Sequence, residues 1–333
     1  MGTIYKTGQP KKNSYSSINT FEQCPFKFFL QYVEGHYVYV DSIASDFGTL
    51  CHHILESIGL DLKFGREIDY EKYKKEFVEI DIPKKDAFDR KGGIYGINAL
   101  KKKYTREFFE ADSNGQSYQT KALDFMNRGI YGLENYMKTH PDWKVWGCEH
   151  YFDVTFDNHR FGGYIDRVLF NEKTGEYLVE DIKTKGHPFK DEELITPLQF
   201  VVYVKALAEI TGAPESKIHC AYDLPICDMR QDAGTKGFVK RGVDKINKIF
   251  AQIENKDFKP NPSPLCFYCQ FCANNPSVPE EGKYLCPYFC KWTRGNKNYD
   301  TEYEWKGMQF HEAIMKQYKK DREALIWIGD LDF

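Results

Sequence analysis

The chain has 333 residues, of which 41% are hydrophobic and 29% charged, and its formal net charge is −3. These values are ordinary for a soluble globular protein of one elaborated domain or two modest ones, and they exclude a wholly basic nucleic-acid-binding protein. A local basic groove is still compatible with this charge, because phosphate contacts depend on where the lysines lie rather than on their sum.

The distribution of apolar residues indicates the cellular compartment of the protein. No apolar run approaches the ~20 residues that span a bilayer, and the N-terminal segment lacks the apolar stretch of a secretion signal. We therefore expect a cytoplasmic protein with no membrane partner, in which the ten cysteines do not form a disulfide framework. Half of the cysteines lie between residues 266 and 290, which indicates a metal site.

The N-terminal half of the chain has mostly helical patterns. Residues 14–35 predict a serine-capped amphipathic helix that is interrupted at Pro25 and then resumes. A second helix is expected from about Phe47 to Leu60. Residues 61–145 are charge-rich, contain no recognisable chemistry and are interpreted as a helical insertion.

Strands follow this insertion. One is predicted at 146–156, a hairpin at 161–185, and a further strand at 217–227, with a helix from about Thr196 to Ile210 before the last strand. This order predicts an α/β fold, in which a mixed central sheet is flanked by helices.

Towards the C-terminus, a helix near 243–254 leads into a proline-rich segment and then into the cysteines. We expect a core domain over residues 1–265 that includes the helical insertion. Residues 266–333 are expected to be a cysteine-cluster segment and tail that pack on this core.

The predicted hairpin carries acids and a lysine at defined positions. Side chains on a strand alternate faces, so Asp181 and Lys183 share a face that Glu180 does not. If the hairpin pairs as its turn suggests, Asp166 joins them. Two carboxylates and an ammonium on half-buried strands are costly to desolvate unless they bind something, and a divalent cation would offset this cost. The alternative is a cross-strand ion pair on a solvated face.

Four further residues could belong to the same site. His52 follows Gly48 by one helical turn and could add an imidazole ligand. Gln199 and Tyr203 share a helix face and could orient a phosphate or the attacking water. Glu149 precedes a short strand and could approach the same sheet face. An ordinary helical histidine and locally hydrogen-bonded polar groups are the alternatives.

These motifs occur in a specific order: CPFKFFLQY at 24–32, G-x-x-x-H at 48–52, G-x-I-D at 163–166, EDIKT at 180–184 and Q-x-x-x-Y at 199–203. In this order they resemble the RecB-like and AddB-like branch of the PD-(D/E)XK nuclease superfamily, which is related to the CRISPR adaptation nucleases. The resemblance covers residues 14–290 apart from the helical insertion. It implies a restriction-endonuclease-like core and hydrolysis of DNA phosphodiesters with Mg²⁺ or Mn²⁺.

The resemblance also implies roles for individual residues. His52, Asp166, Asp181 and the carbonyl of Ile182 are the implied metal ligands. Lys183 is implied to position or activate the attacking water and to stabilise the pentacoordinate phosphate. Gln199 and Tyr203 are implied to support the site and the DNA backbone.

The cysteine cluster allows two interpretations. Cys266, Cys269, Cys286 and Cys290 could form a closed tetrahedral zinc site. The resemblance instead implies a stabilising 4Fe–4S cluster that adds Cys24 to Cys266 and Cys269, with Cys286 or Cys272 as the fourth ligand. The other cysteines are expected to be buried thiols, namely Cys51, Cys148, Cys220 and Cys227.

The leading hypothesis is therefore a metal-dependent DNA exonuclease that acts on linear or single-stranded DNA in repair, recombination or phage replication. No G-x-x-x-x-G-K-[ST] motif is present, so unwinding would require a helicase or recombinase partner. Basic clusters at Lys101–Lys103 and at Lys291, Arg294 and Lys297 could contact the DNA backbone. The alternatives are a catalytically weak DNA-binding or assembly module that retains the fold, and an unrelated zinc-ribbon adaptor.

Overall fold

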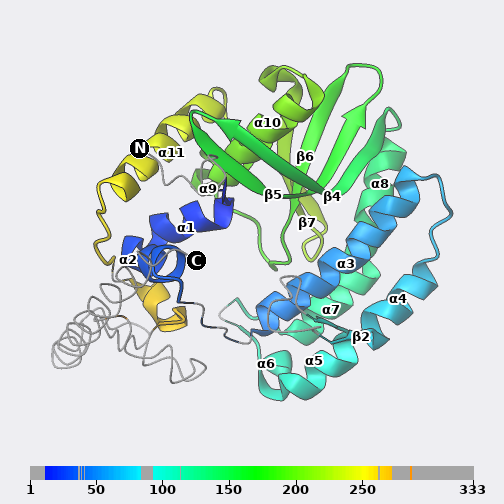
Figure 1. Cartoon of the computed structure of the whole chain (residues 1–333). Helices are drawn as coiled ribbons and strands as arrows, with labels where there is room; N and C mark the ends of the chain where they lie inside the picture. Colours follow the sequence, from blue (N-terminus) through cyan, green and yellow to red (C-terminus); the bar gives the residue numbers. More distant parts are fainter. Residues whose placement is uncertain are drawn as a thin grey trace, which may run out of the picture. The chain divides into compact units, whose positions relative to one another are not determined.

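The computed structural model describes residues 12–36, 38, 40, 42–83, 93–112, 114–261, 263–271 and 286 (Figure 1). The chain forms two compact units. The first comprises Met1–Tyr15 and Ser42–Asn247, and the second comprises Ser16–Asp41 and Lys248–Phe333. The second unit thus joins segments near both ends of the chain. The separate domain boundary predicted at residue 265 stays a prediction.

A six-stranded mixed sheet forms the centre of the first unit. Strand β5 pairs antiparallel with β4 and β6 and parallel with the short β1, while β6 and β7 run parallel and β8 pairs antiparallel with β7. The strands are β1 (Lys12–Asn13), β4 (Trp143–Phe156), β5 (His159–Asn171), β6 (Glu176–Ile182), β7 (Ile218–Leu224) and β8 (Met229–Ala233). The predicted α/β fold with a mixed sheet flanked by helices is confirmed.

The predicted helical insertion is also confirmed in its described part, and its helices pack around an aromatic core. Phe77 stacks on Phe125 with ring centroids 4.7 Å apart, and Phe47 and Phe108 are fully buried. A two-stranded sheet, β2 (Asp81–Ile82) with β3 (Ile94–Tyr95), is added to it. The helices before and within this region are α3 (Ile43–Lys63), α4 (Tyr70–Glu79), α5 (Ile97–Lys103), α6 (Thr105–Phe109), α7 (Tyr118–Asn127) and α8 (Gly132–Thr139).

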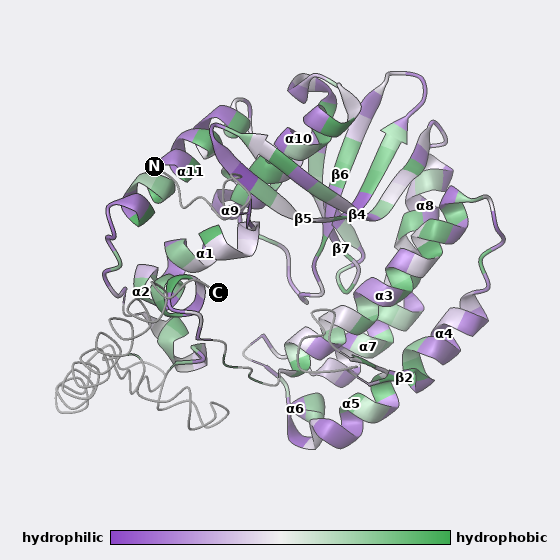
Figure 2. Cartoon of the chain, in the orientation of Figure 1, coloured by the Kyte–Doolittle hydropathy of each residue, from purple (hydrophilic) through white to green (hydrophobic). Residues whose placement is uncertain are grey.

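Helix α10 (Leu198–Thr211) packs on β4, β6 and β7. Hydrophobic residues predominate along it (Figure 2), and its Phe200 is fully buried with its ring centroid 4.8 Å from that of Tyr222. The short α9 (Asp191–Ile195) precedes it. Among the described residues, Asp191–Thr211 is long and apolar enough to cross a membrane by length and composition alone, a test that buried core helices also pass.

The second unit begins with the predicted interrupted helix. Helix α1 (Tyr15–Gln23) ends at Cys24, which has extended backbone angles, and Pro25 opens α2 (Pro25–Phe28), which continues as the π-helix Phe29–Val33. Because proline lacks an N–H and fixes its own φ, it suits the first position of a helix and breaks a helix interior. The interruption at Pro25 is therefore confirmed.

The predicted elements differ from the structure mainly at their ends. Helix α3 is longer than expected, and α11 (Phe238–Glu254) begins five residues earlier than predicted. Strand β8 was not predicted, because its sequence MRQDA has no alternation of apolar and polar residues. Its backbone pairs with β7 in spite of this composition.

Candidate active site

The hairpin of β5 and β6 brings two acids to one face of the sheet. The register pairs Val168 with Val179 and Arg167 with Glu180, so Asp166 and Asp181 are the next positions across from each other. Asp181 is only 1% exposed, and its Oδ1 accepts no hydrogen bond. Lys183 Nζ lies 2.6 Å from Asp181 Oδ2 as an ion pair.

Helix α3 places His52 beside the end of β6. His52 Nε2 lies 3.0 Å from the Ile182 carbonyl oxygen. Because a carbonyl only accepts, Nε2 carries the proton in this hydrogen bond, and Nδ1 faces the acids with its lone pair. Gly48, one turn earlier, faces the chain just after β6: a Cβ atom there would lie 3.5 Å from Thr184 Oγ1, an ordinary contact distance.

Glu149 reaches the same place from β4. The register of β4 against β5 shifts between Val145 and Gly147, which marks a β-bulge. If the register of Val145 had continued, Ile165 would lie opposite Glu149; after the bulge, Asp166 does. Glu149 itself has φ of 43°, in the left-handed region that non-glycine residues seldom adopt.

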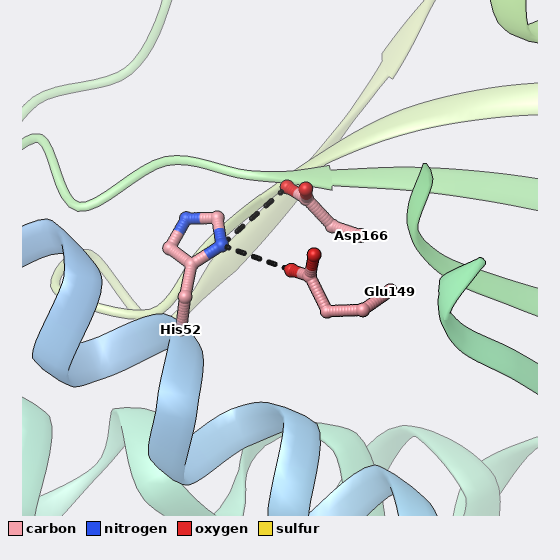
Figure 3. A group of neighbouring side chains, drawn as sticks. All are labelled: His52, Glu149 and Asp166. Atoms are coloured by element: carbon pink, nitrogen blue, oxygen red, sulfur yellow. Dashed lines mark ion pairs between the residues drawn. The ribbon is translucent and has the colours of Figure 1, made fainter. Parts of the chain in front are cut away.

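His52, Glu149 and Asp166 point toward one another (Figure 3). Each offers one atom that could bind a metal, and these three atoms all lie within 4.8 Å of one another. His52 Nδ1 is 3.9 Å from Glu149 Oε1 and 3.8 Å from Asp166 Oδ2. The Ile182 N–H donates to Asp166 Oδ2 at 2.7 Å, which fixes that carboxylate. Two carboxylates and one imidazole suit a hard divalent cation such as Mg²⁺ or Mn²⁺.

Burial and charge shift the pKa values of this group. Burial raises the pKa of Asp166, although His52 and Lys183 oppose the shift. Burial also raises the pKa of Asp181 to about 6, against the effect of Lys183 and with that of Asp166. Burial alone would lower the pKa of His52, but the nearby carboxylates of Glu149 and Asp166 outweigh it and raise this pKa. The site therefore holds more negative charge than its buried position favours, as expected where a cation binds.

The helix that carries Gln199 and Tyr203 adds a polar pair near these acids. Gln199 Nε2 donates to the Tyr203 hydroxyl at 2.8 Å, and the Tyr203 ring packs against Phe152. Burial, and then the charges of Asp181 and Asp166, raise the pKa of Tyr203 well above its ordinary value, so the hydroxyl stays protonated. The sequence-predicted helical pair thus lies within electrostatic range of the acids, and its role stays a prediction.

Glu180 belongs to a different group on the opposite face of the hairpin. It accepts from Arg167 Nε at 2.6 Å and from Arg230, and Arg167 also donates to Asp223. Arg167 and Glu180 are almost completely buried. These ion pairs link β5, β6, β7 and β8, so Glu180 holds the strands together and stays away from the acids of the site.

Four cysteines line one pocket of the second unit: Cys24, Cys266, Cys269 and Cys286. Cys24 Sγ accepts from the Lys27 N–H at 3.5 Å and from the Asn261 N–H at 3.4 Å. Cys266 Sγ accepts from the Ser263 N–H at 3.3 Å. The pocket therefore brings thiols from the N-terminal helices and from the C-terminal segment together with directed N–H donors.

The remaining predicted positions have varied outcomes. Cys51 and Cys220 are buried, whereas Cys148 and Cys227 are only partly buried. Lys103 Nζ lies 3.1 Å from Asp46 Oδ2 as an ion pair. Its predicted contact with the DNA backbone stays a prediction. Five predicted positions lie outside the described residues: Cys272, Cys290, Lys291, Arg294 and Lys297.

Comparison with known proteins gives one match. The model of the PD-(D/E)XK nuclease superfamily matches residues 12–273, a range that includes every residue of the candidate active site. No curated protein matches the chain.

Proposed function

Because the chain belongs to the PD-(D/E)XK nuclease superfamily, a group of metal-dependent nucleases, we propose that it is a Mg²⁺- or Mn²⁺-dependent DNA exonuclease. We place it in the RecB-like branch, on the order of its motifs. The observation that carries the proposal is the convergence of His52, Glu149 and Asp166 beside the Asp181–Lys183 pair. Hydrolysis of a phosphodiester needs both a cation site and a positive group near the phosphate, and this arrangement offers both.

The donor set fits a divalent cation. Asp181 has a buried Oδ1 that accepts no hydrogen bond, and the other three side chains already face one another. We propose that His52, Glu149, Asp166 and Asp181 bind the ion, with the Ile182 carbonyl either as a further ligand or as the acceptor that orients His52. Such an ion neutralises charge on the scissile phosphate and lowers the pKa of the attacking water.

Lys183 acts on the phosphate side of the site. Its side chain is 39% exposed, whereas Asp181 is buried, so the ammonium can reach a bound strand from the open side. There it stabilises the negative charge that develops on the phosphate and positions the water. The Gln199–Tyr203 pair supports the site and the DNA backbone as hydrogen-bond donors.

The test is degradation of linear and circular DNA with Mg²⁺ or Mn²⁺. Lys183→Ala should lower the rate at least ~100-fold, the scale of lost electrostatic stabilisation, with an unchanged circular dichroism spectrum. Lys173→Ala, an exposed lysine in the turn of the same hairpin, is the matched control and should retain activity. Sparing of circular DNA supports an exonuclease. A wild-type protein that binds DNA and hydrolyses none, with either ion, would identify the catalytically weak module instead.

We further propose that Cys24, Cys266, Cys269 and Cys286 bind a 4Fe–4S cluster, with zinc as the alternative. The common pocket of the four cysteines supports this proposal. The resemblance of the cysteine pattern to that of the iron–sulfur nucleases favours this cluster over zinc.

Anaerobic purification tests the cluster. The expected result is a brown protein with about four iron atoms per chain, and Cys24→Ser should lose both colour and iron. Cys227→Ser, a partly buried cysteine of the first unit, is the matched control. Comparison of Cys286→Ser with Cys272→Ser identifies the fourth ligand. A colourless, zinc-loaded protein would overturn the assignment.

The cellular setting follows from the proposed chemistry. An exonuclease without a nucleotide-binding motif of its own requires DNA ends or strands opened by another protein. We therefore propose cytoplasmic DNA repair, recombination or phage replication as its setting, with a helicase or recombinase as partner.

A further inference from the structure

Two tyrosines lie next to the site acids on the β4–β5 ribbon. Tyr151 and Tyr164 face each other in the register, with ring centroids 5.3 Å apart. Tyr164 is two residues before Asp166 on β5, and Tyr151 is two residues after Glu149 on β4. Residues two apart on a strand share a face and are about 7 Å apart, so Tyr164 and Asp166 occupy neighbouring positions on one face of β5.

These rings are unusually open for aromatic side chains. Tyr151 is 47% exposed and Tyr164 is 50% exposed, whereas the other aromatic residues of the sheet are buried or half-buried. Stabilisation of the sheet by a cross-strand aromatic pair explains two paired rings but not their position beside the candidate metal ligands.

Two cations lie on the side of the pair away from the site acids. Lys12 Nζ lies 5.6 Å from the centroid of the Tyr151 ring and donates to its hydroxyl at 3.3 Å. The Tyr151 hydroxyl donates to Asp153, which also accepts two hydrogen bonds from Arg160. These hydrogen bonds hold the Tyr151 ring in place between Lys12 and Asp153.

We propose that Tyr151 and Tyr164 form a stacking platform for an unpaired nucleobase of the strand being cut, about one nucleotide from the scissile phosphate. The proposal rests on the proposed nuclease function and deepens it. Base faces are covered by their neighbours inside a duplex, and only a single strand or an opened end offers one to a protein ring. Lys12 and Arg160 contact the adjacent phosphates, as cations beside a stacking ring do in single-strand-binding proteins.

The experiment compares single-stranded and duplex oligonucleotides by fluorescence anisotropy in EDTA, where no hydrolysis occurs. Tyr164→Ala and Tyr151→Ala should each weaken single-strand binding about 5- to 100-fold, the effect of one lost stacking contact. Duplex binding should change less than about 2-fold. Tyr164→Phe and Tyr151→Phe keep the ring and should bind single strands nearly as wild type does.

Phe64→Ala is the matched control, because Phe64 is 62% exposed and also lies beside cations, Lys63 and Arg66. It ends α3 twelve residues after His52, about 18 Å along the helix. Wild-type affinity of both alanine variants for single strands, or an equal loss for duplex, would overturn the platform. If the wild-type protein still hydrolyses DNA in that case, the proposed nuclease function stands. If it neither hydrolyses nor binds DNA, both proposals fail.

Discussion

Adjacent acids on β6 should have opposite effects on stability. Although burial opposes its ionisation, Glu180 has a pKa of about 2 because Arg167 and Arg230 hold its charge. Burial raises the pKa of Asp181 to about 6. Each departs from its ordinary value by somewhat more than two pKa units, and one unit corresponds to about 1.4 kcal/mol. Ionised Glu180 therefore stabilises the fold by about 3 kcal/mol, and ionised Asp181 destabilises the metal-free protein by a similar amount.

The two contributions occupy different pH ranges. Glu180 stabilises the protein above its unfolded-state pKa near 4.5, and this contribution is lost as the pH falls towards 2. Asp181 has the opposite sign: stability is highest below its unfolded-state pKa near 3.8 and declines as the pH rises through 6. Between pH 6 and 8 both contributions are constant.

The assay is urea unfolding of metal-free protein, followed by far-ultraviolet circular dichroism between pH 4.5 and 7.5. At pH 7.5, Glu180→Gln should lower the free energy of unfolding by about 3 kcal/mol, because Arg167 is left buried with one carboxylate fewer. Asp181→Asn should raise it, by up to about 3 kcal/mol, and should remove its decline between pH 4.5 and 6. A metal-free Asp181→Asn protein that is clearly less stable than wild type at pH 7.5 would refute the reasoning.

Three other outcomes are expected. Binding of Mg²⁺ at pH 5 should release at least about one proton, because Asp181 must ionise, and fewer at pH 8; calorimetry in two buffers of different ionisation enthalpy measures this, and equal heats at pH 5 contradict it. Glu149→Gln should weaken Mg²⁺ binding about 10- to 100-fold while urea unfolding stays as in wild type; unchanged affinity would exclude Glu149 from the metal ligands. Gly48→Ala should retain activity, since its Cβ meets Thr184 at an ordinary contact distance. Gly48→Leu should displace Thr184 and with it the end of β6, and should lower kcat at least tenfold. Equal rates for the two variants would show that this contact does not position the site.

Sequence reasoning succeeded where a local rule decides the structure. Alternation along a strand was enough to separate Asp181 from Glu180, because β6 is regular and its partner strand is only a short turn away. The break at Pro25 follows from proline alone. The position of His52 at the sheet could be predicted only with the order of the motifs, because a single histidine on a helix does not indicate which site it belongs to.

Other features depend on irregular or distant pairing, which the sequence does not reveal. The sequence indicated only that Glu149 could approach the site, because no residue type marks the bulge before Gly147 that places it opposite Asp166. Strand β8 is polar, and its backbone pairs with β7 through hydrogen bonds that its side chains do not predict.

The composition of the second unit has a consequence for synthesis on the ribosome. Cys24 accepts a hydrogen bond from a residue 237 positions later in the chain. At ~5–20 residues per second, translation needs about 10–50 s to reach that partner. During this delay Phe271, which completes the apolar cluster of Phe26 and Leu30, has not yet been synthesised. The cysteines that share a pocket with Cys24 are also still missing. The first unit can therefore be complete before the second, whose N-terminal helices gain their partners only when the last part of the chain has been made.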